Sequence, residues 1–410
     1  MTFLLALLAL SPAVAPAAAQ PPAVAASTAA ALVPVPSSAL PDFKESFKGR
    51  AQLIQAAKEA IAYLKTLPPN KSLAIAGRSY APAALIDSAR AMIAIARAAK
   101  TQDELAARVR ETFDAFRSVG LDGQGRVIFS SYYEPVLPAS LRRAKGYPYP
   151  LYRRPPDMVE VDLGAFGLDL SSTEPSALLG RVGRDGRVSP YFTREDIDRR
   201  KALAGRGLEI AWLKDRLEAL DLHIQGSGLL RLRNGREVLA RYAGTNGLPF
   251  GSVGLALVRA GVFKPGELTH TKLHDYLRKN PDAVSWILSR NPRYTFFELA
   301  ALPPGGEPAG AAGEPLVPAR TVAVDPGVVP LGVLLYFSTV CPQADKNGRL
   351  LGRFPTERYA FALDTGGAIQ GPGRVDIYAG HGPQAETTAR YQWDGGALFV
   401  LVKKLPDRSR

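Results

Sequence analysis

Three segments between residues 50 and 116 repeat apolar residues with the period of an amphipathic helix. The first segment ends before Pro68 and Pro69, and the third begins at a capping box formed by Thr101 and Glu104. We expect the three apolar faces to pack into a core, and we assign no chemistry to them. The aligned positions are Leu53, Ile54, Ala57, Ile61 and Leu64; Leu85, Ala89, Met92 and Ala96; and Leu105, Val109, Phe113 and Phe116.

At Val127 the pattern changes to that of β-strands, and a strand is expected from there to Pro135. The middle of the chain mixes both patterns: mainly helix over 196–220, a strand over 222–232, and helices over 250–260 and 268–288. Short strands separated by Gly and Pro turns follow, and they indicate a closed barrel or a sandwich. These strands are expected at 295–297, 321–324, 334–337, 359–363, 375–378 and 397–402.

Composition limits the class of protein. The chain has 410 residues, 46% of them hydrophobic, which is enough for two or three domains with buried cores. The single cysteine, Cys341, excludes an internal disulfide framework and cysteine-based metal sites. The formal net charge of +13 indicates an anionic partner such as nucleic acid, a membrane surface or an acidic wall polymer. Basic and aromatic residues interleave from Arg142 to Arg154, but no nucleic-acid-binding signature accompanies them, so we expect no nucleic acid partner.

The N-terminal residues are typical of an export signal. Phe3 to Leu10 is apolar but too short to span a bilayer, and Ala17 to Ala19 fits a small-residue cleavage site. No basic residue precedes the apolar segment, so an apolar tail that remains on the protein is the alternative. We predict a signal peptide over 1–19 and an Ala/Pro-rich linker over 20–42.

Metal and nucleophile motifs are weak. His270 and His274 have the spacing of two ligands on one helix, but Thr271 replaces the glutamate of a zinc-protease motif and no third ligand is evident. We therefore expect both histidines at the surface or at a helix end. Ser227 lies between two glycines without the sequence of a nucleophile elbow, and the chain has no phosphate-binding loop motif. We expect neither a metal nor a cofactor.

Two aspartates are the best candidates for acid–base chemistry. Asp364 and Asp376 lie at the edges of apolar, strand-like segments and are followed by glycines or small residues. A carboxyl group in partly apolar surroundings has a raised pKa, as a general acid near neutral pH requires. Glycines beside it allow a polymer to approach the backbone closely. The alternative is that both aspartates only stabilise turns of a barrel.

Seven segments carry a resemblance to a known family. In order along the chain they are Tyr132–Pro135, Ile224–Gly228, Tyr242–Gly247, Asn291–Phe297, Ala323–Pro326 with Pro330–Gly332, Asp364–Ile369, and Asp376–Tyr378 with Gly380 and Gly382. Each segment alone is a weak signal, but together and in this order they are highly specific. From about Ile128 to Lys403, the chain resembles the MltA family of membrane-bound lytic murein transglycosylases.

The resemblance implies a mainly β protein with N-terminal helices, in which a double-psi β-barrel (3D domain) carries an inserted second β-rich domain. The implied ranges are 43–141 for the helices and the first part of the barrel, 142–291 for the insert, and 292–405 for the rest of the barrel with the catalytic aspartate. Many family members are lipoproteins, but Cys341 is the only cysteine here, so we do not expect a lipid anchor. The expected location is the periplasm or cell envelope, with association to the outer membrane and the oligomeric state left open.

The resemblance also implies an activity: cleavage of the β-1,4 bond between MurNAc and GlcNAc of peptidoglycan glycan strands, leaving a 1,6-anhydroMurNAc end. We name the exolytic type, although the residues themselves do not distinguish exolytic from endolytic cleavage. The family's single catalytic aspartate corresponds to Asp376. Asp364 falls on the Asp-x-Gly-Gly-Ala-Ile motif, and we expect it to support the local structure or the developing positive charge.

Further residues on these motifs are expected to bind the glycan in a groove between the two domains. Their amide, hydroxyl and carboxyl groups suit sugar hydroxyls and N-acetyl groups, and the tyrosine offers a stacking face. The alternative is that they stabilise glycine-rich turns. The expected set is Tyr133, Glu134, Gln225, Ser227, Thr245 and Asn246.

Two other functions stay open at this point. One is a noncatalytic glycan-binding barrel, which would tolerate the loss of Asp376. The other is a hydrolase, in which Asp364 or another carboxylate activates water instead of the sugar's own hydroxyl.

Overall fold

A computed structural model describes residues 31–45, 49–163, 165, 177–183, 185–264, 267–268, 270–302 and 306–404. The predicted signal peptide and the first part of the predicted linker lie outside these residues. Within them, no helix is both long and apolar enough to cross a membrane. The structure is mainly β with helices at its N-terminal end, as predicted.

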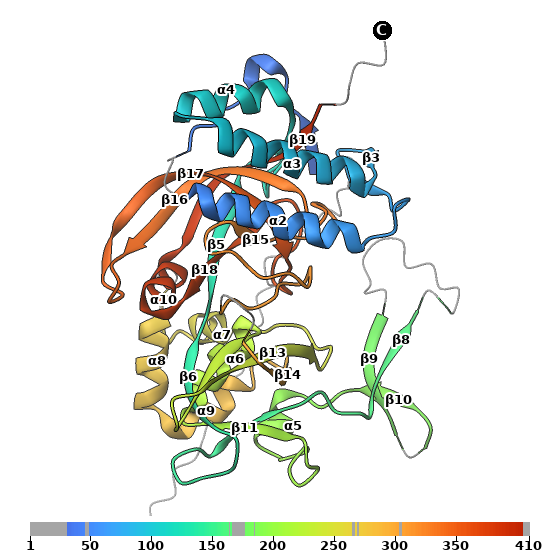
Figure 1. The fold of residues 1–410 in the computed structure, drawn as a ribbon. Helices are drawn as coiled ribbons and strands as arrows, with labels where there is room; N and C mark the ends of the chain where they lie inside the picture. The colour runs from blue at the N-terminus through green and yellow to red at the C-terminus, as the bar shows by residue number, and fades with distance from the viewer. Residues whose placement is uncertain are drawn as a thin grey trace, which may run out of the picture.

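A closed six-stranded barrel forms the upper part of the molecule in Figure 1. Its closure comes from the last strand, which pairs with the first barrel strand as well as with its neighbours in the sheet. Two parallel strand pairs, β5 with β18 and β15 with β17, cross the barrel, and the predicted double-psi barrel is confirmed. The strands are β5 (Val127–Glu134), β15 (Thr321–Ala323), β16 (Leu334–Ala344), β17 (Leu350–Asp364), β18 (Arg374–His381) and β19 (Trp393–Lys403).

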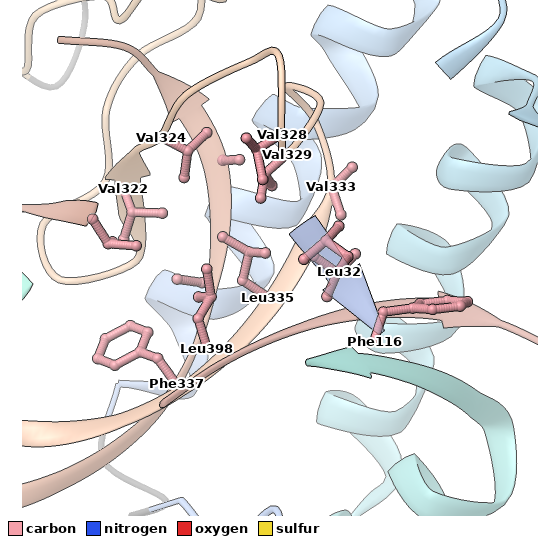
Figure 2. Packing of buried hydrophobic residues seen from close by; sticks show 14 of the residues in the cluster. Leu32, Phe116, Val322, Val324, Val328, Val329, Val333, Leu335, Phe337 and Leu398 are labelled. Carbon is pink, nitrogen blue, oxygen red and sulfur yellow. The ribbon is translucent and has the colours of Figure 1, made fainter. Parts of the chain in front are cut away.

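Alternation along these strands separates a core face from an outer face. Val127 and Phe129 of β5 lie in the barrel core with Val375 and Ile377 of β18, all of them buried. Figure 2 shows the packing of other hydrophobic residues of the same core cluster, among them Val322 and Leu335. Because successive residues of a strand point to opposite faces, the residues between these core positions point away from the core.

Three helices cover one end of the barrel, as the apolar periods predicted (Figure 1). They are α2 (Arg50–Thr66), α3 (Pro82–Ala98) and α4 (Gln102–Thr112). Thr101 caps α4 by accepting a hydrogen bond from the backbone N–H of Glu104. The extension of this helix through Phe113 and Phe116 is wrong: both residues belong to strand β4 (Phe113–Ser118), which pairs with β1 (Leu32–Pro34) and β19.

A second sheet of six strands is built from the middle of the chain. Its first and last strands, β14 and β7, lie in contact, so that the sheet curls into a nearly closed second barrel. Its strands are β6 (Val136–Ser140), β7 (Tyr149–Tyr152), β11 (Glu209–Leu213), β12 (Gly228–Leu232), β13 (Glu237–Thr245) and β14 (Thr295–Ala300). A smaller sheet beside it holds β8 (Met158–Asp162), β9 (Ala177–Val182) and β10 (Val188–Pro190), and a separate hairpin holds β2 (Leu73–Ile75) and β3 (Arg78–Tyr80).

These two sheets of the middle of the chain and the helices around them are called the second unit below. The positions of its helices correct one prediction. The helix expected over 196–220 is instead a short helix, a strand and the start of another helix, because Gly205 and Gly207 adopt left-handed backbone angles (φ +73° and +67°) that interrupt it. The strand expected from residue 222 begins only at Gly228, after a helix that ends at Gln225 and is capped by Gly226. The helices are α5 (Arg194–Asp198), α6 (Arg216–Gln225), α7 (Val253–Arg259), α8 (His270–Lys279) and α9 (Pro281–Leu288), and α10 (Gly382–Tyr391) lies on the barrel.

The two sheets are joined directly by the chain at Pro135, where β5 of the barrel passes into β6 of the second sheet (Figure 1). The residues at the C-terminal end of β5 are therefore held between the two units. The domain ranges given above stay a prediction.

Candidate active site

The outer face of β5 and β18 carries a cluster of polar side chains. These two parallel strands place Asp376 opposite Ser130 and Tyr378 opposite Tyr132. Because Phe129, Val375 and Ile377, which alternate with them, fill the barrel core, all four side chains project to the outer face. The rings of Tyr132 and Tyr378 lie with their centroids 5.2 Å apart. This face is where the sequence predicted acid–base chemistry.

Asp376 is half-buried and accepts a hydrogen bond from the Ser130 hydroxyl. The Ser130 hydroxyl donates a hydrogen bond of 2.6 Å to Asp376 Oδ1 and accepts one of 3.0 Å from Arg374 Nη2. Burial raises the pKa of the Asp376 carboxyl to about 6, against the opposing effects of Ser130 and Arg374, and the nearby Asp364 raises it further. A carboxyl group with this pKa can both give and take a proton near neutral pH.

Asp364, at the end of β17, is held more tightly. The Tyr132 hydroxyl donates to its Oδ2 at 2.6 Å, and the backbone N–H groups of Ala311 and Thr365 donate to Oδ1 at 2.8 and 2.9 Å. Burial raises the pKa of Asp364, and these three hydrogen bonds oppose the rise because they favour the charged form. Both oxygens of Asp364 thus already accept hydrogen bonds from the protein.

Glu134 is a third carboxyl group on the same face. Its Oε2 accepts a hydrogen bond of 2.8 Å from Ser227, which comes from the turn between α6 and β12 of the second unit. Its Oε1 is buried without a hydrogen-bond partner among the described residues. Burial raises the pKa of Glu134 to about 8, with smaller contributions from Glu307 and Asp364, so this side chain is neutral at pH 7.

Several residues of the cluster were not predicted from the sequence. Tyr378 donates a hydrogen bond to Glu307 Oε2, and His381 Nδ1 lies 3.4 Å from Glu307 Oε1. Ser130 donates a hydrogen bond to Asp376, and Arg374 donates one to Ser130, as described above. The alternation of β5 and β18 was a signal for Ser130 and Arg374, since both share a strand face with predicted residues. No signal pointed to Glu307, because it lies in an irregular loop.

Tyr133 lies on the opposite side of β5 from the two aspartates. Its ring is buried, 8% exposed, in a cavity between the barrel and the second unit, which Glu386 and Arg390 of α10 also line. Its backbone N–H donates to Gln225 Oε1 at 3.2 Å. The structure therefore brings Glu134 and Ser227 to the cluster of Asp364 and Asp376, and it directs Tyr133 away from it.

Thr245 and Asn246 are buried in the second unit. Asn246 is fully buried; its Nδ2 donates to the carbonyl groups of Phe192 and Pro292, both at 2.9 Å, and its Oδ1 accepts from the N–H of Tyr294 at 2.9 Å. Thr245 Oγ1 accepts from the N–H of Gly247. Both side chains hold loops together in this structure, which favours the alternative of turn-stabilising residues.

Of the two histidines considered as a metal pair, the structure describes the side chain of His274 only. His274 is buried, 6% exposed, and its Nε2 lies 3.3 Å from Asp221 Oδ1, so the expectation of a surface position is wrong for this residue. Residues 31–404, with the gaps stated above, contain no group of three His, Cys, Asp or Glu side chains that could hold a metal ion.

Comparison with known proteins gives concordant matches. Residues 128–298 match the MltA specific insert domain, and residues 320–401 match the 3D domain. The chain is 29% identical over 290 residues to membrane-bound lytic murein transglycosylase A of Escherichia coli (strain K12), covering 70% of this chain and 69% of that protein.

Solved structures agree with these matches. The crystal structure of a membrane-bound lytic murein transglycosylase from Agrobacterium tumefaciens superimposes with a TM-score of 0.69 at 28% identity, covering 91% of this chain and 98% of that one. MltA from Neisseria gonorrhoeae in its monoclinic form gives a TM-score of 0.68 at 25% identity, with coverages of 92% and 93%.

Proposed function

The chain belongs to the MltA family of lytic murein transglycosylases, and from this membership we propose that Asp376 is the acid and base with which it cleaves peptidoglycan glycan strands. One observation carries the assignment of the residue. Asp376 lies on the outer face of the barrel, half-buried, with a pKa raised to about 6 by burial. Of the two candidate aspartates, it is the one whose hydrogen bonds leave an oxygen for the substrate.

The reaction requires two proton transfers through one carboxyl group. Protonated Asp376 donates its proton to the glycosidic oxygen as the bond between C1 of MurNAc and that oxygen breaks, so that GlcNAc leaves with a free hydroxyl. The 6-hydroxyl of the same MurNAc then attacks C1, and ionised Asp376 takes the proton of that hydroxyl. The new bond joins C1 and O6, the 1,6-anhydro ring forms, and no water is consumed. A second catalytic carboxylate is therefore unnecessary.

Asp364 acts in a different way in this proposal. Its oxygens already accept three hydrogen bonds from the protein, so little capacity remains for a hydrogen bond to the substrate. Its negative charge can still act on the substrate through electrostatic attraction. A negative charge close to the reacting centre stabilises the positive charge that develops on the sugar ring. It also raises the pKa of Asp376. Both effects favour the first step, in which Asp376 must be protonated.

Glycan contacts are proposed for the groups that face this cluster. Glu134 is neutral at pH 7 and is bridged to the second unit through Ser227, which places both at the junction of the two units. A neutral carboxyl group can donate a hydrogen bond to a sugar hydroxyl or to an N-acetyl carbonyl. We retain exolytic cleavage as part of the proposal.

The relatives are named membrane-bound, and an envelope location for this chain agrees with that name. Export to the periplasm by removal of residues 1–19 is our proposal, based on the apolar segment and the alanines that follow it.

Digestion of purified glycan strands in water enriched in ¹⁸O tests the proposed reaction. The expected product ends in 1,6-anhydroMurNAc, is one water lighter than a hydrolysis product, and contains no heavy isotope at the new end. Incorporation of ¹⁸O would identify a hydrolase, and binding without any cleavage would identify a noncatalytic glycan-binding barrel.

A further inference from the structure

An exposed tryptophan lies on the same barrel face as Asp376. Trp393 begins β19 and is paired with Ser130 of β5, which in turn is paired with Asp376 of β18. Directly paired residues on neighbouring strands project from the same face of a sheet. Asp376, Ser130 and Trp393 therefore form one row across three strands, and two strand spacings, about 10 Å, separate the ends of the row.

The indole ring is held in place and is still open to solvent. Trp393 is 63% exposed, which is high for the largest aromatic side chain. The Arg374 guanidinium carbon lies 4.1 Å from the centroid of its ring, and Arg374 Nη2 bonds to Ser130 at 3.0 Å. The Arg374 side chain thus connects the tryptophan to the hydroxyl that holds Asp376, and it fixes the ring relative to the reacting carboxyl group.

We propose that Trp393 is an aromatic platform for a sugar residue of the glycan strand, a subsite beside the one in which the bond is cleaved. The indole face would stack on the C–H face of a pyranose ring, which buries apolar area without a need for hydrogen bonds. The row runs across the three β-strands. A glycan strand that passes Asp376 along this row meets the indole ring after one or two sugar residues. The inference rests on the proposed function, because it takes the glycan as the ligand and Asp376 as the point of cleavage.

The charge beside the ring fits the same ligand. Arg374 is half-buried and contributes a positive charge between the tryptophan and the reacting carboxyl group. MurNAc carries a lactyl group that ends in a carboxylate or in a stem peptide with carboxylates. A guanidinium group pairs with such groups more effectively than with a neutral sugar. The platform is therefore expected to favour a strand that contains MurNAc over a strand of GlcNAc alone.

The chain offers a matched control for this residue. Trp286 of α9 is 56% exposed, and the guanidinium carbon of Arg290 lies 4.0 Å from its ring centroid. It thus repeats the stacked pair of Arg374 and Trp393 with similar exposure. It lies on a helix of the second unit and has no place in the row with Asp376. Replacement of Trp286 removes an equal aromatic surface without touching the proposed subsite.

Binding and turnover are measured separately to test the proposal. In an Asp376→Asn background, the dissociation constant for purified glycan strands is compared between Trp393→Ala and Trp286→Ala by titration. An aromatic contact of this kind corresponds to about a three- to tenfold loss of affinity. We expect that loss for Trp393→Ala, a smaller one for Trp393→Phe, and none for Trp286→Ala. In the otherwise native enzyme, Trp393→Ala should raise KM for long strands by a similar factor and leave kcat unchanged.

The failure of this inference differs from failure of the proposed function. If the native enzyme produces anhydro ends but Trp393→Ala and Trp286→Ala bind strands equally well, the platform is refuted and the function stands. If the native enzyme releases no anhydro product, the function is refuted, and a selective loss of binding in Trp393→Ala would still support a glycan surface at this position. Melting temperatures equal to that of the native enzyme verify that both alanine variants are folded.

Discussion

The pKa of Asp376 is set by identifiable neighbours, and replacing two of them should move it in opposite directions. The Ser130 hydroxyl stabilises the charged carboxylate, so Ser130→Ala should raise the pKa of Asp376 above its value of about 6. The Asp364 carboxylate disfavours a second negative charge, so Asp364→Asn should lower the same pKa. A purely structural role of either residue would not produce opposite shifts.

The size of the first effect follows from the hydrogen bond. A hydrogen bond to a charged group contributes about 1.5–3 kcal/mol, and 1.36 kcal/mol corresponds to a pKa shift of one unit. Because Asp376 is half-buried and solvent replaces part of the lost bond, we expect the lower end of this range, about one pH unit. The acid must be protonated for the first step, so the alkaline limb of kcat/KM should move from near pH 6 to near pH 7 in Ser130→Ala.

The assay is the initial rate of release of anhydro-ended fragments from glycan strands, measured between pH 4 and pH 9. Ser140→Ala is the matched control, because the Ser140 hydroxyl bonds to the Arg142 carbonyl in an exposed part of the second unit. Its profile should coincide with that of the native enzyme. The reasoning is refuted if Ser130→Ala leaves the alkaline limb unmoved, or if Ser130→Ala and Asp364→Asn shift it in the same direction.

Other changes have equally definite expected outcomes. Asp376→Asn should lower the cleavage rate by at least about 10²–10⁴-fold, because it cannot transfer the proton, and circular dichroism and strand binding should show a folded, binding-competent protein. Because the folded-state pKa of Asp376 is raised from 3.8 to about 6, its stabilising contribution is complete below pH 3.8 and is lost as the pH rises through 6. Urea titration should therefore find Asp376→Asn more stable than the native protein above pH 6, by at most about 3 kcal/mol, with no such difference near pH 3.5. Glu134→Gln, which mimics the neutral acid, should likewise raise the melting temperature at pH 9 but leave it unchanged near pH 4, since the pKa of Glu134 is raised to about 8; an equal change at both pH values would contradict this origin. Asn246→Ala should destabilise the protein by about 3 kcal/mol in denaturant titrations, because buried carbonyl groups lose their donor; weakened glycan binding at unchanged stability would instead support a sugar contact.

Elements with a clear period were predictable from the sequence. The apolar faces of α2 and α3 repeat at helical spacing, and five of the six short strands predicted after Tyr294 are barrel strands at apolar segments bounded by glycine and proline. The first of the six, at 295–297, is instead β14 of the second sheet. The errors fall where local pattern and tertiary pairing disagree. Phe113 and Phe116 continue a helical period, but the edges of β19 and β1 offer hydrogen bonds to this segment, and it becomes a strand.

The candidate site was predictable only in its motif residues. Asp364, Asp376, Glu134 and Ser227 lie on segments with a recognisable sequence. The structure gathers the three carboxyl groups on one face of the barrel, and Ser227 of the second unit bonds to Glu134 there. The motif alone could not orient Tyr133: the alternation of β5 puts it on the face of Val127 and Phe129, opposite to the face that carries Ser130 and Tyr132.

The same reasoning explains why an amide that looks suited to a sugar can belong to the core. A short motif rich in glycine is expected wherever the backbone turns tightly, and its polar side chains can satisfy either a ligand or the turn itself. Asn246 uses both ends of its amide on backbone groups of loops distant in sequence, which leaves no capacity for a ligand. Ser227 instead bonds to Glu134, a carboxyl group with a second oxygen that has no partner among the described residues. The difference between a structural and a binding role lies in the hydrogen-bonding capacity that remains, and only coordinates show how much of it each residue has used.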